Sequence, residues 1–249
     1  MAGKNGSGGR IGKKGLFGLG KKKRFRHRPG QSQRCVIFDF DGTVADTYDL
    51  ALQLLLEMAE SRHIRATKRG IEQLRMMSAA EVIRKYRLSV LDMIFLVKRY
   101  SDIVYRRLVR IRVFPEVKPV IAELDRSYGL GIISSNRREN VAGFLHHNGL
   151  DKYFDFLETG SPLLGKPRRI RAIMKKHGYA KDDVVYVGDE VRDIEAARKV
   201  GVKIVAVGWG WNNPKRLKAA KPDFFVGRPS QLLHAVRKAL DGRKKPRRS

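Results

Sequence analysis

Residues 35–43 read CVIFDFDGT. This stretch is an apolar run followed by two aspartates, Asp39 and Asp41, and a turn that begins at Gly42. The run CVIF contains β-branched side chains and is typical of a strand buried on both faces of a parallel sheet. Because side chains alternate between the two faces of a strand, we expect Asp39 and Asp41 on one side and Phe40 in the packing. Gly42 then permits a sharp turn.

Two carboxylates at the end of a buried strand repel each other and lose hydration, so a purely structural reason for both is hard to find. A bound cation would resolve this conflict, and Mg²⁺ accepts a site made of a few carboxylates, water and a substrate phosphate. Open α/β sheets also bind their ligands at the carboxyl ends of the strands. The structural alternative is that one aspartate caps a helix while the other is solvated.

The composition predicts a folded chain without a membrane span. With 249 residues, 42% of them hydrophobic, the chain is long enough for a full core in one or two domains. No apolar run approaches the roughly 20 residues that cross a bilayer. The single cysteine, Cys35, lies in the predicted strand and excludes an intrachain disulfide. A reducing compartment agrees with this cysteine usage, so we expect a cytoplasmic protein.

The formal net charge of +28 is extreme and unevenly distributed. Residues 1–34 contain eleven Lys or Arg, nine Gly and no acidic residue, so we expect a disordered basic arm. Residues 241–249 form a second basic tail. Such segments bind polyanions through phosphate contacts, so non-specific contact with RNA is one expectation. The alternative is that the tails only keep the protein soluble.

Beyond the first strand, residues 46–113 carry a helical pattern with no strand signal. Strand and helix patterns then alternate, which is typical of a parallel sheet covered by helices on both faces. The expected strands are 130–134, 154–157, 184–187, 203–207 and 222–226, and the expected helices include 119–127, 139–148, 168–177 and 230–240. We therefore predict a doubly wound α/β core of residues 35–45 and 114–240, with a helical insert of residues 46–113.

Further polar side chains stand where the later strands of the predicted sheet end. Ser134 closes the strand LGIIS, and Lys166 lies in the segment GSPLLGKP, which is interpreted as a loop. Asp189 follows the strand VVYV, and Asp193 comes four residues later, so the two share one face of a helix that begins there. Each signal is weak alone, but their order along the chain is a strong pattern.

With DFDGT first, a strand ending in Ser second, GKP third and GDEVRD fourth, residues 35–235 resemble the haloacid dehalogenase superfamily of phosphatases. The helical insert after the first motif resembles the small type 1 cap of that family. The phrase YVGDEVRDIEAA and the placement of the cap are similar to the phosphoglycolate phosphatase branch. The resemblance implies a Rossmann-like core and a Mg²⁺-dependent phosphatase that acts on a small phosphate ester. The basic tails lie outside it.

The resemblance also implies roles for individual residues. Asp39 would be the nucleophile that forms an aspartyl phosphate, and Asp41 the general acid and base. Mg²⁺ would be bound by Asp39, the backbone carbonyl of Asp41, and Asp189. Ser134 would donate a hydrogen bond to the phosphate, and Lys166 would hold both the phosphate and Asp39.

A second set of residues would support the first. Glu190 and Asp193 would orient metal-bound water or Lys166 as outer-shell groups. Ser135 is the alternative to Ser134 as the phosphate contact. Arg75, in the insert, is considered as a substrate contact and not adopted.

Three other functions remain in competition. Dehalogenation is disfavoured because dehalogenases lack the second aspartate, here Asp41. A sugar phosphomutase shares every motif and is separated from a phosphatase mainly by the cap. The third alternative is a polyanion-binding protein in which the domain is only a scaffold. It is disfavoured because a scaffold has no use for buried like charges. Phosphoglycolate is the first substrate expected from the resemblance, followed by a nucleotide or sugar phosphate.

Overall fold

A computed structural model describes residues 33–242, apart from residues 62, 64, 66, 78 and 161–164. Nearly all of the predicted basic arm and most of the basic tail therefore lie outside the described residues. Within the described part of the chain, no helix is both long and apolar enough to cross a membrane.

The core is a six-stranded parallel sheet with the strand order β5-β4-β1-β6-β7-β8. Its strands are β1 (Cys35–Phe38), β4 (Gly129–Ser134), β5 (Phe156–Thr159), β6 (Val184–Gly188), β7 (Lys203–Val207) and β8 (Phe224–Val226). β1 lies between β4 and β6, and its CVIF run is completely buried. The chain builds outward to one side of β1 and then to the other, so a topological switch point lies between β1 and β6.

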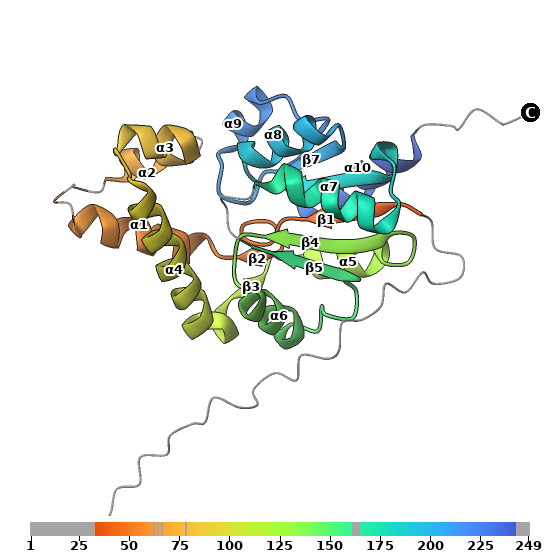
Figure 1. Cartoon of the computed structure of the whole chain (residues 1–249), viewed down its shortest axis with the longest axis horizontal. Coiled ribbons are helices and arrows are strands. Elements are labelled where there is room, and N and C mark those ends of the chain that lie inside the picture. Colours follow the sequence, from red (N-terminus) through yellow and green to blue (C-terminus); the bar gives the residue numbers. More distant parts are fainter. Residues whose placement is uncertain are drawn as a thin grey trace, which may run out of the picture.

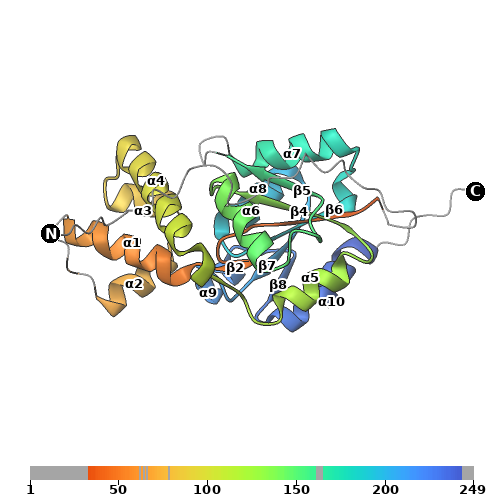
Figure 2. The ribbon, with the colours of Figure 1, turned by 90° about the horizontal axis from the view of Figure 1, so that it is seen from below.

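Helices cover both faces of this sheet (Figure 1). One core joins the sheet to α5 (Val117–Leu124), α6 (Arg138–His147) and α10 (Leu232–Asp241), and the other joins it to α7 (Lys166–His177), α8 (Val191–Val200) and α9 (Pro214–Ala219). Figure 2 shows α5 and α10 on one face and α7 and α8 on the other. Alternate residues of β1 enter the two cores, with Val36 and Phe38 in one and Cys35 and Ile37 in the other. This arrangement confirms the predicted doubly wound α/β fold.

Four helices form a separate group at one end of the sheet (Figures 1 and 2). They are α1 (Tyr48–Ser61), α2 (Lys68–Arg75), α3 (Ala79–Lys85) and α4 (Val90–Arg107), followed by the 3₁₀ helix η1 (Leu108–Arg110). These helices make up most of the helical insert of residues 46–113. Two short strands, β2 (Ala45–Asp46) and β3 (Arg112–Val113), pair antiparallel where the chain enters and leaves it. These two strands at the edges of residues 46–113 were not predicted, because two-residue strands carry no periodic signal.

Several element boundaries also differ from the prediction by one to three residues. β5 begins two residues later than expected. α7 begins at Lys166 rather than at residue 168, because Pro is tolerated in the first turn of a helix and the preceding Gly165 adopts a φ of +66°. The short helix α9 was not predicted. The three-residue 3₁₀ helices η3 (Lys181–Asp183) and η4 (Pro229–Gln231) were not predicted as separate elements either.

Candidate active site

Asp39 and Lys166 form the centre of the site. Asp39 directly follows β1 and is 3% exposed, and Lys166, the first residue of α7, is 6% exposed. The Lys166 Nζ lies 2.6 Å from Asp39 Oδ2 and also contacts an oxygen of Asp193. Lys166 is therefore a buried helix residue and not the loop residue that the sequence suggested. Placing one ammonium between two carboxylates satisfies part of the charge that folding buries.

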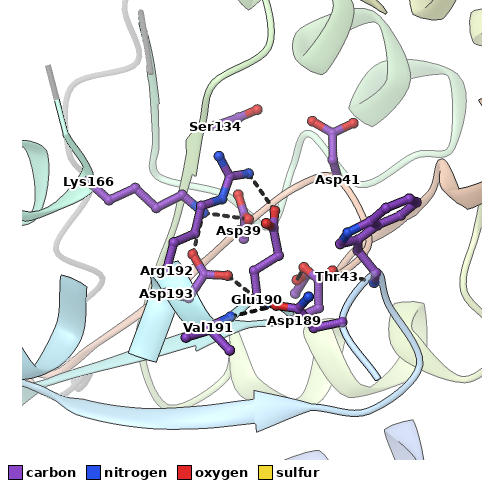
Figure 3. Close-up of polar contacts among 12 residues, drawn as sticks. Asp39, Asp41, Thr43, Ser134, Lys166, Asp189, Glu190, Val191, Arg192 and Asp193 are labelled. Atoms are coloured by element: carbon purple, nitrogen blue, oxygen red, sulfur yellow. Dashed lines mark hydrogen bonds and ion pairs between the residues drawn. The ribbon is translucent and has the colours of Figure 1, made fainter. Parts of the chain in front are cut away.

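Asp193 connects this pair to the start of α8. Its Oδ2 accepts a hydrogen bond from the Glu190 backbone N–H at 3.0 Å, in a capping box at the helix N-terminus. The Glu190 carboxylate turns instead to the Arg192 guanidinium (Figure 3). Asp193 thus contacts Lys166, one of the groups that the resemblance implied it would orient, whereas Glu190 contacts a cation that had not been considered.

Asp189 is completely buried at the end of β6. Its Oδ1 accepts a hydrogen bond from Thr43 Oγ1 at 2.8 Å, and its Oδ2 accepts one from the Trp211 backbone N–H at 2.7 Å. Gly42 adopts a φ of +73°, and a Cβ there would lie 2.3 Å from Asp189 Oδ2. The DGT turn is therefore shaped to let this carboxylate approach the backbone closely.

Asp41 lies at the junction between the core and the helical insert. Its Oδ1 accepts a hydrogen bond of 2.8 Å from the hydroxyl of Tyr100, a residue of α4. The Asn136 side-chain amide lies 3.4 Å from Asp41 Oδ1 and 3.5 Å from its Oδ2. The insert thus contributes a contact to this carboxylate. Figure 3 shows the Asp41 carboxylate apart from the cluster formed by Lys166 and Asp193.

Ser134 and Ser135 follow one another at the end of β4. Ser134 is completely buried, and its Oγ accepts a hydrogen bond from the Asn136 backbone N–H at 2.9 Å. Its hydroxyl proton thus remains available to an acceptor. Ser135 is half-buried. The choice between the two as a phosphate contact stays open.

Burial shifts the acid–base properties of the site. Loss of hydration raises the pKa of Asp41 to about 6, although the hydrogen bond from Tyr100 works against the shift. Burial also raises the pKa of Asp193 to about 6, with Lys166 opposing it. The pKa of Asp189 lies well above its usual range because of burial and the nearby carboxylates of Glu190 and Asp39. Burial lowers the pKa of Lys166, but Asp193 and Asp39 together outweigh it and hold the pKa well above the ordinary value.

The cluster has the ligand types and charge for a divalent cation. Carboxylate oxygens of Asp39, Asp189 and Asp193 all lie within 4.8 Å of one another, and all three residues are buried. Lys166 pairs with two of them, but Asp189 receives hydrogen bonds only from neutral donors among the described residues. An uncompensated buried carboxylate is costly, and a hard cation with oxygen ligands would compensate it.

Several contacts of the site could not be found from the sequence. Tyr100 lies in a helical stretch whose pattern does not separate a residue facing the core from any other half-buried tyrosine. The contact of Trp211 with Asp189 uses the backbone N–H, on which the side-chain pattern carries no information. Thr43 and Asn136 do follow strand ends, and this position is the one signal that would have identified them.

Comparisons with known proteins agree with this geometry. The profile of a family described as haloacid dehalogenase-like hydrolase matches residues 36–207. A phosphoglycolate phosphatase from Synechococcus elongatus is 38% identical over 205 residues, which cover 82% of this chain and 97% of that protein. The pyrophosphatase PpaX of Listeria welshimeri is 29% identical over 116 residues, covering 45% of this chain and 54% of that protein.

The fold has matches among solved structures as well. A haloacid dehalogenase-like hydrolase from Streptococcus pneumoniae superposes with a TM-score of 0.68 at 21% identity, covering 82% of this chain and 98% of that one. That similarity supports the fold alone. The family profile and the near full-length relative from Synechococcus elongatus carry the classification, and the buried acidic cluster agrees with it. The chain therefore belongs to the haloacid dehalogenase-like hydrolase family, among the phosphatases of that family.

Proposed function

We propose that this protein is a Mg²⁺-dependent phosphatase that hydrolyses a small phosphomonoester through an aspartyl phosphate on Asp39. The observation that carries the proposal is the convergence of Asp39 and Asp189, at the carboxyl ends of the neighbouring strands β1 and β6, with Lys166 at the start of α7. Asp39 Oδ2 is engaged by Lys166, whereas Asp39 Oδ1 has no hydrogen-bond partner among the described residues. This second oxygen is the one that would attack phosphorus.

The reaction would proceed in two steps. In the first, an Asp39 oxygen bonds to phosphorus while the bond from phosphorus to the ester oxygen breaks, and Asp41 gives its proton to the leaving oxygen. In the second, Asp41 takes a proton from water, which attacks phosphorus, releases inorganic phosphate and restores the Asp39 carboxylate. A pKa of about 6 suits Asp41 to both directions of proton transfer.

The ligands of the metal would be Asp39, Asp189 and the backbone carbonyl of Asp41. When bound, Mg²⁺ would supply positive charge that reduces the repulsion between the nucleophile and the phosphate. Asp193 would hold Lys166 in place, as its contact with the ammonium suggests. Glu190, paired with Arg192, would support the start of α8.

The phosphate would be held by Lys166 and by a hydroxyl of Ser134 or Ser135. The helical insert would act as a cap, so that residues 35–45 and 114–240 form the core domain and residues 46–113 the cap domain. The hydrogen bond from Tyr100 to Asp41 supports this assignment, because it brings α4 against the proposed general acid. A cytoplasmic location is consistent with the single buried cysteine, Cys35.

The proposed substrate is phosphoglycolate, supported by the similarity to the Synechococcus elongatus enzyme of that name. The similarity to a pyrophosphatase makes inorganic pyrophosphate the first competitor to test. A panel containing both, together with sugar and nucleotide phosphates, separates these substrates by kcat/KM. Conversion of one sugar phosphate into its isomer, without release of phosphate, would instead indicate a phosphomutase.

The decisive assay is phosphate release with and without Mg²⁺, for the wild type and Asp39→Asn. Asp151→Asn is the matched control, since that aspartate is exposed and only faces His146 at 3.9 Å. We expect the wild type and Asp151→Asn to require Mg²⁺, and Asp39→Asn to lose at least about 10³-fold in kcat. Equal hydrolysis by the wild type and Asp39→Asn would refute the proposed function.

A further inference from the structure

The loop of residues 208–213, between β7 and α9, contacts both the helical insert and the acidic cluster. Arg75, the last residue of α2, donates from Nε to the Trp211 carbonyl at 3.0 Å and from a terminal nitrogen to the Gly210 carbonyl at 3.4 Å. Its guanidinium also lies over the ring of Tyr48, 5.1 Å from the centroid. Arg75 thus donates mainly to backbone carbonyls of the core, and these hydrogen bonds connect α2 to this loop.

The peptide group between Gly210 and Trp211 connects Arg75 of the helical insert with Asp189 of the acidic cluster. Its carbonyl oxygen accepts from Arg75, and its N–H donates to Asp189 Oδ2 at 2.7 Å. A Cβ at position 210 would lie 2.3 Å from Asp189 Oδ2 and 2.3 Å from the Gly42 carbonyl oxygen, so only glycine lets the loop approach so closely. Any movement of Arg75 that turns this peptide group also changes the hydrogen bond to Asp189.

Asn212 makes a second connection of the same kind. It is 2% exposed, and its Nδ2 donates to the backbone carbonyls of Arg75 at 3.0 Å and of Met77 at 3.3 Å. Its Oδ1 accepts from the backbone N–H of Val191 at 2.8 Å, at the first residue of α8. One buried side chain therefore links the end of α2 to the helix that carries Asp193.

We propose that Arg75 and Asn212 form a latch that joins the helical insert to the loop of residues 208–213 and, through this loop, sets the orientation of Asp189. The inference rests on the proposed function, in which Asp189 is a metal ligand. Arg75 and Asn212 are positioning residues, because they act through the loop rather than on the reacting atoms. By linkage, closing of the insert and binding of Mg²⁺ then favour each other.

Substitutions can separate the two halves of the latch. Asn212→Asp keeps the acceptor for the Val191 N–H but puts a carboxylate oxygen where the donor to the insert stood. Arg75→Met removes both bonds to the loop, and Arg75→Lys keeps the charge without the planar fork that reaches two carbonyls. The matched control is Arg216→Ala, which removes a 3.1 Å bond from the core to Glu81 of the insert and leaves the loop untouched.

The first readout needs neither metal nor activity. With 5-fluorotryptophan in the full chain, ¹⁹F NMR reports Trp209 and Trp211 separately, and Trp209→Phe assigns the two resonances. We expect Asn212→Asp and Arg75→Met to move the Trp211 resonance of the metal-free protein, and Arg216→Ala to leave it in place. An unchanged Trp211 resonance in both latch variants overturns the proposal.

The second readout is the Kd for Mg²⁺, measured by calorimetry, beside KM and kcat for a phosphate ester. We expect both latch variants to weaken Mg²⁺ binding about tenfold, Arg75→Lys to lie between them and the wild type, and Arg216→Ala to match the wild type. Equal weakening by Arg216→Ala, or no weakening by the latch variants of an active enzyme, overturns the latch and leaves the proposed function intact. A wild type that neither binds Mg²⁺ nor hydrolyses the ester overturns the proposed function, and the Trp211 resonance then decides alone about the latch.

Discussion

At the scale of the residue, the site is a group of carboxylates whose charge the protein compensates only in part. Lys166 forms ion pairs with Asp39 and Asp193, while Asp189 accepts hydrogen bonds only from neutral donors among the described residues. Asp41 stands apart from Lys166 and contacts Tyr100 instead. This separation gives the two aspartates of the DFDGT motif different environments, as the proposed roles of nucleophile and general acid require.

Removing the hydroxyl of Tyr100 should shift the pH dependence of the reaction. Its hydrogen bond lowers the pKa of Asp41, which burial raises to about 6, so Tyr100→Phe should raise that pKa further, by about one unit. Because Asp41, as the proposed general acid, would have to be protonated to release an alkoxide, the fall of kcat with rising pH should move to higher pH. An alkyl phosphate should show the shift, whereas p-nitrophenyl phosphate, whose leaving group needs no proton, serves as the control. If the fall of kcat at high pH stays in place or moves to lower pH in Tyr100→Phe, the role given to Tyr100 is contradicted.

Positions at strand ends are what made Asp39, Asp41 and Asp189 identifiable from the sequence alone, whereas Lys166, in a segment interpreted as a loop, was identified through the resemblance in the order of the motifs. Side chains that follow neighbouring parallel strands must meet at one edge of the sheet, so the order of strands and polar residues carries that information. The contact from Tyr100 depends on how the insert packs on the core, which no local pattern encodes. The same is true of Arg75, whose bonds go to backbone carbonyls of a loop about 135 residues away.

At the scale of the element, the strands that were predicted well are those with a long, fully buried apolar run. β1 and β6 are of this kind, β7 differs only at the half-buried Lys203, and the residues of these strands alternate between the two cores. The elements that were missed are short. α9 has only six residues, although Asn213 caps it and Pro214 opens it, which are recognisable start signals. A pair of two-residue strands, β2 and β3, offers no signal of this kind.

The pairing of β4 with β5 depends on the absence of a side chain at Gly131. A Cβ at this position would lie 2.0 Å from the ring of Phe156, its partner in the register. Gly131→Ala should therefore lower the free energy of unfolding by about 1–3 kcal/mol through overpacking. Gly160→Ala is the control, because a Cβ there meets nothing within 4 Å. Urea unfolding with an unchanged m-value measures the difference, and equal midpoints for the two variants would contradict this packing.

At the scale of the whole molecule, folding buries carboxylates that bind protons more tightly than in the unfolded chain. The pKa values of Asp41 and Asp193 rise to about 6, against about 3.9 for an ordinary aspartate. The folded state therefore binds more protons across this window. The contribution of these groups to stability is complete below about pH 4 and is lost as the pH rises to about 6.

Mg²⁺ should restore this stability where the carboxylates are ionised. We expect Mg²⁺ to raise Tm clearly near pH 7.5 and little near pH 5, because burial also raises the pKa of the proposed ligand Asp189, so that protons compete with the metal for its oxygens. Asp189→Asn removes a proposed ligand and should abolish the response to Mg²⁺ near pH 7.5, while Asp151→Asn should preserve it. A wild-type Tm that is indifferent to Mg²⁺ at both pH values would argue against a metal site in this cluster.

The net charge of +28 gives the whole molecule a second testable property. If the arm contacts RNA, removing residues 1–32 should weaken binding to a single-stranded RNA at low salt and reduce the slope of log K against log salt. Fluorescence anisotropy of a labelled RNA over a series of KCl concentrations measures both quantities. The shortened chain, which begins at Gln33, keeps every described residue, so phosphatase activity is the control for folding. Identical slopes would remove any role of the arm in RNA binding.

The most direct test of the central claim is to trap the phosphoryl group on the enzyme. A single turnover stopped with acid and reduced with borohydride converts an aspartyl phosphate into homoserine, which mass spectrometry locates to one residue. We predict that homoserine replaces aspartate at position 39 alone, only when both substrate and Mg²⁺ were present before the quench. Reduction at Asp41 instead, or phosphate release at full rate with no reduced residue, would contradict the claim that Asp39 accepts the phosphoryl group.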